Sequence, residues 1–202
     1  DLLDGLNNPE RWLTYSGDYS GRRHSPLEQL TRENVAGLKP AWIFQTGLTA
    51  NLEATPLVVD GFIYFTGPYN HGWALDARTG REVWHRVENL PSTLSLCCGW
   101  VNRGFAVFGE RLYLARLDAT LLAMDMKTGE PIGGIVLDDH ELGYSATSAP
   151  LVVKDKVVVG IAGSINGTRG FIDAYDVNTG RLAWRFWTVP EPGEPGGDTW
   201  TG

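Results

Sequence analysis

Several features that mark other classes of protein are scarce or missing in this sequence of 202 residues. No apolar run approaches the roughly 18 residues of a membrane-spanning helix, so we expect no transmembrane segment. The 17 Lys and Arg residues are outnumbered by 24 Asp and Glu and form no basic stripe, which argues against a nucleic-acid partner. The four histidines have no metal-ligand spacing, and no C-x-x-C-H haem-attachment motif is present.

The first residues also lack the marks of a secretory leader. The chain opens at Asp1 with no basic stretch and no apolar stretch, so we predict no signal peptide within it. A mature exported protein would look the same after processing.

Cysteine is equally scarce, and the two copies are adjacent at Cys97 and Cys98. A disulfide between neighbouring residues requires a strained ring, since disulfide geometry normally holds the two Cα atoms well apart. Strain of this kind concentrates at functional sites. The other interpretation is a pair of reduced thiols, because buried free cysteine behaves as a small hydrophobic residue. The cysteines alone leave both interpretations open.

What the sequence does have is a repeat. A pattern of Ala, Asp and Thr-Gly recurs at a spacing near 50 residues, which is typical of propeller blades. Its three copies are Ala74–Gly80, Ala123–Gly129 and Ala174–Gly180. The aspartate accepts N–H groups across a tight turn, and Thr-Gly supplies a hydroxyl and a positive φ. The first and third copies lead to Trp84 and Trp184, which we expect to pack on a neighbouring blade. Gly133 takes this position in the second copy, so one contact between blades must be filled differently.

Two more strand-like runs precede each copy of the repeat. The pairs are 55–59 with 62–65, 105–108 with 112–115, and 149–153 with 157–160. Hairpin turns are expected between them at Asp60-Gly61, Gly109-Glu110 and Lys154–Lys156. Four short strands per period predict an all-β fold made of about three propeller blades.

The remaining segments set the predicted domain organisation. Residues 1–40 form a lead-in with a short helix over 30–37 capped by Thr31, and residues 41–189 form the blades. Residues 41–46 are predicted to be the last strand of a further blade, and the Pro- and Gly-rich residues 190–202 a loop. Propellers typically close with four to eight blades, so we expect residues 1–202 to be part of one larger domain.

These residues resemble the N-terminal third of the pyrroloquinoline-quinone (PQQ)-dependent alcohol dehydrogenases, whose fold is an eight-bladed propeller. The repeat followed by tryptophan is similar to that family's tryptophan-docking motif. The cysteine pair followed by Arg103 is the most specific point of resemblance. Further similarity lies in residues 12–20, 23–27 and 38–42.

The resemblance implies that PQQ sits on the propeller axis, covered on one face by a disulfide ring of Cys97 and Cys98. It implies that Arg103 pairs with a cofactor carboxylate, for which a planar cation suits well. Glu53 would lie near the cofactor, and Thr147 would donate its hydroxyl to the quinone. The loop whose backbone N–H groups would approach a cofactor carboxylate consists of Ala162, Gly163 and Ser164.

The activity implied by the resemblance is oxidation of an alcohol to an aldehyde or ketone by hydride transfer to the quinone. The implied location is the periplasm, and the implied electron acceptor is a c-type cytochrome. The family's catalytic base and stacking tryptophan fall outside this chain. We therefore assign no catalytic residue and expect the isolated chain to be inactive.

The resemblance breaks at Ile165. The family's metal, usually Ca²⁺, takes a glutamate at this position, and isoleucine offers no oxygen to a hard cation. Asn166 is adjacent, but an offset of one residue usually aims a side chain elsewhere. We therefore assign no metal ligand. Two alternatives stay open beside the enzyme: a non-catalytic propeller that serves as a binding scaffold, and a PQQ-binding member with an altered metal site.

Overall fold

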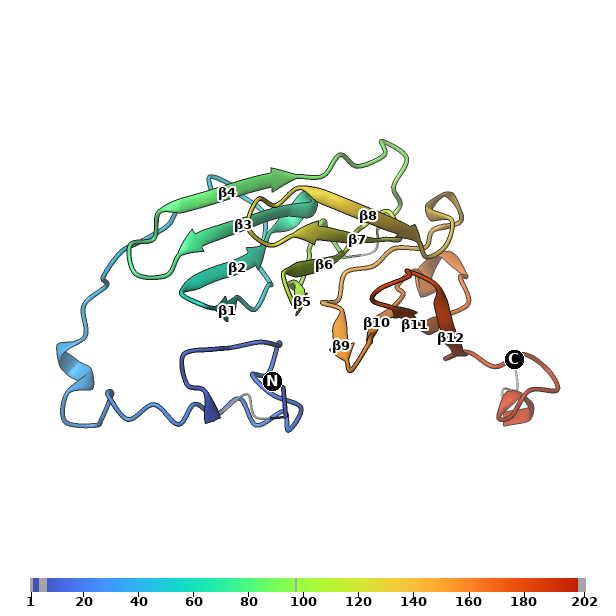
Figure 1. The fold of residues 1–202 in the computed structure, drawn as a ribbon. Helices are drawn as coiled ribbons and strands as arrows, with labels where there is room; N and C mark the ends of the chain where they lie inside the picture. Colours follow the sequence, from blue (N-terminus) through green and yellow to red (C-terminus); the bar gives the residue numbers. More distant parts are fainter. Residues whose placement is uncertain (1, 4–6, 97, 200–202) are drawn as a thin grey trace.

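The structure, a computed structural model, contains three four-stranded antiparallel sheets that follow one another along the chain (Figure 1). It describes residues 2–3, 7–96 and 98–199. The first sheet contains β1 (Leu57–Val59), β2 (Phe62–Thr66), β3 (His71–Asp76) and β4 (Glu82–Val87). The second contains β5 (Ala106–Phe108), β6 (Arg111–Ala115), β7 (Thr120–Asp125) and β8 (Pro131–Val136). The third contains β9 (Leu151–Val153), β10 (Lys156–Gly160), β11 (Phe171–Asp176) and β12 (Leu182–Trp187). The predicted all-β architecture with four strands per repeat is confirmed.

Tight hairpins join the first two strands of each sheet near the predicted turns. In the first sheet, Asp60 and Gly61 both have positive φ, 49° and 83°, as the favoured two-residue hairpin turns require. β1 begins at Leu57, two residues later than predicted. The reason is Pro56, which has no N–H group to donate to a strand ladder.

The repeated Asp-x-x-Thr-Gly segment forms the same turn in all three sheets. Asp76 Oδ1 accepts hydrogen bonds from the Thr79 hydroxyl and the Thr79 amide, both at 2.8 Å. The Gly80 amide donates to the Asp76 carbonyl at 2.9 Å. Asp125 and Asp176 repeat these bonds in their own turns. Because the ionised carboxylate is the acceptor, these bonds lower the pKa of all three aspartates, and the pKa of Asp176 falls to about 2.

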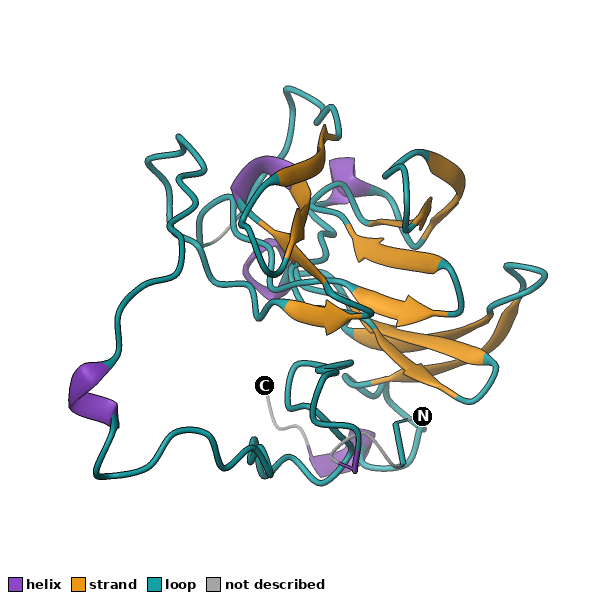
Figure 2. Cartoon of the chain, turned by 60° about the vertical axis from the view of Figure 1, so that its left-hand side comes forward, coloured by secondary structure: helices purple, strands orange, loops and turns teal. Residues whose placement is uncertain are grey.

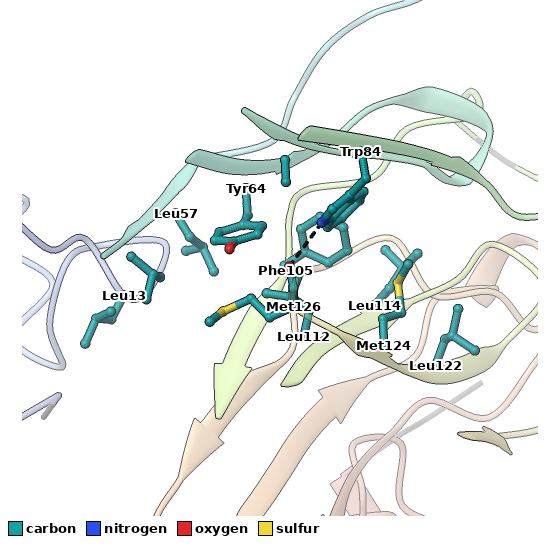
Figure 3. Packing of buried hydrophobic residues seen from close by; sticks show 12 residues of the cluster. Leu13, Leu57, Tyr64, Trp84, Phe105, Leu112, Leu114, Leu122, Met124 and Met126 are labelled. Carbon is teal, nitrogen blue, oxygen red and sulfur yellow. Dashed lines mark hydrogen bonds between the residues drawn. The ribbon is translucent and has the colours of Figure 1, made fainter. Parts of the chain in front are cut away.

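A tryptophan from the preceding segment packs on two of these turns. Trp84 in β4 donates from Nε1 to the Met126 carbonyl at 3.0 Å, which Figure 3 marks with a dashed line. The Trp84 ring covers Gly129, where a Cβ would stand only 2.7 Å from Trp84 Cδ2. Trp42 covers Gly80 in the same way and donates to a carbonyl of that turn at 3.0 Å. Glycine is therefore required here by the close approach of the ring as well as by its positive φ.

The turn of the third sheet is held by other side chains. Gly133 lies opposite Ala123, the position at which Trp84 lies opposite Ala74 in the first sheet. In place of an indole, Arg111 Nη1 donates to the Val177 carbonyl at 2.8 Å, and Tyr113 Oη donates to the same oxygen at 3.3 Å. The expectation that this contact is filled differently is confirmed.

Apolar side chains fill the space between successive sheets. The cluster between the first and second sheets, drawn in Figure 3, includes Leu57, Tyr64, Trp84, Phe105, Leu112, Leu114 and Met124. The cluster between the second and third sheets includes Ala106, Tyr113, Leu121, Val152, Val157 and Tyr175. Two separate cores therefore join three sheets.

The segment before β1 is almost entirely loop: its first part lies near the inner strands, and the remainder swings out through η2 before it returns to the first sheet (Figure 1). Figure 2 shows the same wide excursion from another side. Trp12 pairs with Val58 in β1 through two backbone hydrogen bonds of 2.9 Å. Tyr19 Oη donates to the Val152 carbonyl in β9 at 2.7 Å. The segment thus connects the first sheet to the third.

Two predictions for the region before β1 are wrong. Residues 41–46 form no strand, because no strand in the described part of the chain lies beside them to complete a ladder. The helix expected over 30–37 is only the 3₁₀ turn η2 (Val35–Gly37). No residue of η2 is buried, and so short a helix is marginal without packing.

The other helical turns are equally short. They are η3 (Pro68–Asn70), η4 (His140–Leu142), η5 (Ser164–Asn166) and η6 (Gly197–Thr199). None of the helices in the described residues has the length and apolar character of a membrane span.

We expect Trp84→Ala to lower the free energy of unfolding by about 3–5 kcal/mol, because it removes a buried ring and its bond to Met126. Urea unfolding monitored by circular dichroism measures this loss. Glu82→Ala, at an exposed position of the same strand, is the control and should change the stability by less than about 0.5 kcal/mol. A loss for Trp84→Ala no larger than that of the control would contradict the role of the indole.

The acid dependence of stability should report on the aspartate turns. The Thr179 amide and the Lys156 ammonium depress the pKa of Asp176, so its stabilising effect is complete above the unfolded pKa of 3.8 and disappears as pH falls through about 2. Asp176→Asn should therefore be less stable than the native chain at pH 7, and the difference should shrink between pH 4 and pH 2. Thermal unfolding across this pH range tests it, with the exposed Glu28→Gln as control. A difference that is independent of pH would exclude ionisation as the cause.

Candidate cofactor site

The segments that precede the inner strands of the three sheets lie side by side at one end of the molecule. The Thr55 amide, just before β1, donates to the Arg103 carbonyl at 3.4 Å. The Arg103 amide, just before β5, donates to the Thr147 carbonyl at 3.0 Å. Backbone bonds thus hold the entries to β1, β5 and β9 together and place their side chains within reach of one another.

Arg103 is the centre of this arrangement. Its Nη1 donates to Thr147 Oγ1 at 2.8 Å, and its Nη2 lies 2.9 Å from Glu53 Oε2. The structure therefore brings together three of the residues that the sequence singled out. The Arg103 side chain remains 39% exposed, and these contacts engage only part of the five N–H donors of its guanidinium. It can consequently bind an external acceptor without losing its protein partners.

The residues on either side of Arg103 hold its backbone in position. Gly104 has φ 128°, and a Cβ there would lie 3.2 Å from the Thr55 carbonyl, so a side chain would push the two segments apart. Asn102 is fully buried, donates to the Ala115 carbonyl at 2.8 Å and accepts from the Gly104 amide at 3.1 Å. The Arg103 backbone is thus held from both sides.

The loop of Ala162, Gly163 and Ser164 lies against the third of these segments. Ala162 and Ser145 exchange backbone hydrogen bonds of 2.7 and 3.0 Å. Gly163 has φ 137°, and a Cβ there would lie 2.5 Å from the Gly143 carbonyl. The Ala162 amide already has an acceptor, so the amides open to further binding in this loop are to be sought at Gly163 and Ser164.

The cysteine segment is described only in part. Cys97 lies outside the described residues, and Cys98 lies in an exposed loop. The pairing of the two cysteines stays a prediction. Beyond them, the Trp100 ring stacks on Tyr69 with centroids 5.4 Å apart, and the Tyr69 amide donates to the Trp100 carbonyl at 2.9 Å.

Tyr69 and Asn70, in η3, form a strained turn that the sequence reasoning missed. Both have positive φ, 59° and 57°, which is uncommon for residues other than glycine. Asn70 is fully buried; its Oδ1 accepts from the Leu117 amide at 3.2 Å and its carbonyl from the Glu88 amide at 3.4 Å. Asparagine tolerates the left-handed region better than most residues, so Asn70 following Gly67-Pro68 was the available signal.

The loop around Ile165 does not fit a metal site. Ile165 is 66% exposed, and the adjacent Asn166 donates its amide to the Gly143 carbonyl at 3.2 Å and toward the Ser95 carbonyl at 3.5 Å. No group of three or more His, Cys, Asp or Glu side chains suited to a metal ion occurs among the described residues. Asn166 instead ties this loop to the segment that precedes the cysteines.

The space next to Arg103 can hold a ligand. A cleft of about 440 Å³ opens there, and its walls include Tyr15, Asp18, Ser148 and Pro150. This volume lies in the range of small-molecule sites. The planar Arg103 cation in its wall suits a ligand that carries a carboxylate.

Substitutions at Asn70 should separate its side-chain hydrogen bond to Leu117 from its tolerance of a positive φ. Asn70→Gly removes the bond to the buried Leu117 amide but tolerates the φ of 57°, so it should cost about 1–3 kcal/mol. Asn70→Ala loses the same bond and strains the backbone, so it should cost about 1–2 kcal/mol more. Chemical unfolding of both variants measures the difference. Equal stability of the two would show that the left-handed turn is not under strain.

Comparisons with known proteins identify the family of the chain. Residues 12–202 match the family model described as the PQQ-dependent glucose/ethanol/alcohol dehydrogenase β-propeller domain. Quinohemoprotein alcohol dehydrogenase ADH IIB of Pseudomonas putida is 44% identical over 187 residues, which cover 91% of this chain and 27% of the relative. The quinoprotein alcohol dehydrogenase PedH of Pseudomonas putida is 37% identical and covers 94% of this chain and 32% of its own length. The chain thus spans about a quarter to a third of the length of these relatives.

Solved structures give the same answer for the fold. The structure of ADHIIG from Pseudomonas putida HK5 superposes with a TM-score of 0.89 at 40% identity, over 97% of this chain and 30% of that one. A europium-containing methanol dehydrogenase superposes with a TM-score of 0.87 at 34% identity, over 94% and 34%. BamB from Moraxella catarrhalis, at 19% identity and a TM-score of 0.51 over 68% and 41%, shares the fold alone. The three sheets are therefore part of a β-propeller, and the chain belongs to the PQQ-dependent alcohol dehydrogenase family.

Proposed function

We propose that the protein containing these three blades oxidises an alcohol to an aldehyde or ketone with PQQ as its cofactor. The observation that carries the proposal is the contact of Glu53 and Thr147 with Arg103, which itself lines a cleft of ligand size, in a chain of this family. When bound, PQQ supplies the quinone that accepts two electrons from the alcohol. The relatives ADH IIB and PedH are both named as alcohol dehydrogenases, which supports this substrate class.

In this proposal the residues of the site bind and orient the cofactor. Arg103 pairs with a carboxylate of PQQ through the N–H donors that Glu53 and Thr147 leave unused. Glu53 holds the guanidinium plane in place and offsets part of its charge. The Thr147 hydroxyl accepts from Arg103 and donates its own proton to a cofactor oxygen.

The neighbouring loops complete the proposed site. The amides of Gly163 and Ser164 approach a second carboxylate, while Ala162 anchors their loop through its bonds to Ser145. Cys97 and Cys98 form a vicinal disulfide that covers one face of the cofactor. The contacts of Trp42 and Trp84 with glycine turns are, in this proposal, the family's tryptophan-docking interactions.

The proposal assigns no metal ligand to this chain. Ca²⁺ requires several oxygen ligands, and the loop around Ile165 offers no carboxylate. A metal in the whole protein would have to be held by groups other than these. PQQ binding with an altered metal site is therefore part of the proposal.

Location and electron acceptor rest on the relatives. A periplasmic enzyme that passes its electrons to a c-type cytochrome is consistent with the quinohemoprotein names of two of them. The small-molecule partner is the alcohol itself.

Ile165 favours a second candidate function, a propeller that serves as a binding scaffold without catalysis. A scaffold needs the indole contacts between blades but no cofactor-binding Arg103. The two candidates therefore differ in whether the full-length protein binds PQQ.

Titration of the full-length apoprotein with PQQ, followed by quenching of tryptophan fluorescence, distinguishes them. We expect Arg103→Ala to weaken binding at least tenfold, because it removes a charge-assisted contact worth about 1.5–3 kcal/mol. Arg103→Lys should recover part of the loss, and Cys97→Ala and Cys98→Ala should also weaken binding. Arg32→Ala, an exposed arginine far along the chain from the site, is the control.

Two outcomes would favour the scaffold. One is no saturable PQQ binding by the native protein, together with no dye-linked alcohol oxidation at any added metal concentration. The other is native-like PQQ binding in the Arg103→Ala, Cys97→Ala and Cys98→Ala variants alike.

A further inference from the structure

The three blade turns present the same glycine surface, but only two of them are covered by an indole. On the first two turns, a Cβ at Gly80 or Gly129 would lie 2.5 and 2.7 Å from the ring above it. On the third turn, the atom nearest to such a Cβ at Gly180 is Ile135 Cδ1, at 3.5 Å. The room that the other turns give to an aromatic ring is therefore not filled by one here.

A cleft opens at this place between the second and third sheets. Its volume is about 480 Å³, within the range of small-molecule sites. Its floor and walls include Ala123, Gly133, Gly134, Ile135 and the turn residues 178–180. Both walls belong to described strands and turns of this chain, so the cleft does not depend on any further blade.

One charged group at the edge of the cleft has no counter-ion within the described part of the chain. Arg111 lines the cleft, and its Nη1 donates a hydrogen bond to the Val177 carbonyl at 2.8 Å. Among the residues that the structure describes, no ion pair is formed by Arg111. Asp176, the acid that also lines the cleft, is already paired with Lys156 at 3.2 Å and bonded to its own turn. A guanidinium with free donors suits a carboxylate and stacks on aromatic rings.

We propose that this cleft is a binding site for a planar aromatic acid of about indole size. The ring lies beside Gly133, which takes in β8 the position that Trp84 takes in β4 and has open space where a side chain would stand. The carboxylate pairs with Arg111, whose charge selects an acid over a neutral ring. This cleft is separate from the Arg103 site: it is lined by residues of β6, β7 and β8 and by the turn at 176–180, and Arg103 is not among them.

The probe for the test is indole-3-acetate, with indole-3-acetamide as its neutral counterpart. Saturation-transfer NMR and calorimetry on the full-length protein measure binding of each. We expect a dissociation constant of about 1 mM or below for the acid, the affinity usual for a ligand of this size. We expect the amide to bind at least fivefold more weakly.

Two variants locate the binding. Gly133→Trp places an indole in the cleft itself, so it should abolish binding of the acid and raise the melting temperature. Arg111→Gln keeps the cleft but removes the charge, so it should bring the affinity for the acid down to that for the amide. Arg81→Gln, at an exposed arginine just before β4, is the matched control and should bind like the native protein.

The proposal fails if the native protein shows no saturable binding of the acid up to 10-fold above the expected constant. It also fails if the affinity is the same in Arg111→Gln as in the native protein, since binding would then lie elsewhere. Should Gly133→Trp not fold, Arg111→Gln decides the question by itself.

Discussion

The contact on which the arrangement of the sheets depends is an indole ring resting on a bare glycine of the next blade. Trp84 meets Gly129 so closely that no other residue fits beneath it, and its N–H group finds a carbonyl in the same turn. The aspartate of that turn holds the glycine in its positive-φ conformation by accepting from the backbone. The aspartate turn, its glycine and the tryptophan therefore depend on one another and set the distance between the first and second sheets. The buried core of Figure 3 fills the space between these two sheets.

The candidate site is a consequence of this stacking. Because the sheets are stacked with their inner strands adjacent, the residues that enter β1, β5 and β9 meet at one end. Arg103 reaches Thr147 across 44 positions of sequence, and Gly104 allows the backbone of the first segment to come within contact distance. Glu53, Arg103 and Thr147 are far apart in the chain, and the fold brings them together.

The sequence predicted the local features well because their causes are local. The strands, hairpins and aspartate turns follow from alternation, glycine and hydrogen bonding within a few residues. Gly133 showed from the sequence that a tryptophan is missing from this position. The sequence did not show that Arg111 and Tyr113 would donate to the Val177 carbonyl instead. Residues 41–46 look like a strand because they have the side chains of one, yet a strand exists only beside a partner.

The site could be predicted only in part, for the same reason. Glu53, Arg103 and Thr147 were singled out by resemblance to a family, not by any pattern that places them in contact. The strained turn at Tyr69 and Asn70 was not predicted, because the contacts of these residues with Trp100 and Leu117 join segments that are distant in the sequence. Composition carries no trace of such a turn beyond an asparagine that tolerates positive φ.

The hydrogen bond from Arg103 to Thr147 also affects how firmly two sheets are held together. It spans from the second sheet to the third, which is the boundary where no indole locks one blade to the next. A ligand that binds both Arg103 and Thr147 therefore holds the second and third sheets together at the ends of their inner strands. Occupancy and cohesion become thermodynamically linked, since anything that binds only the closed arrangement stabilises it by mass action.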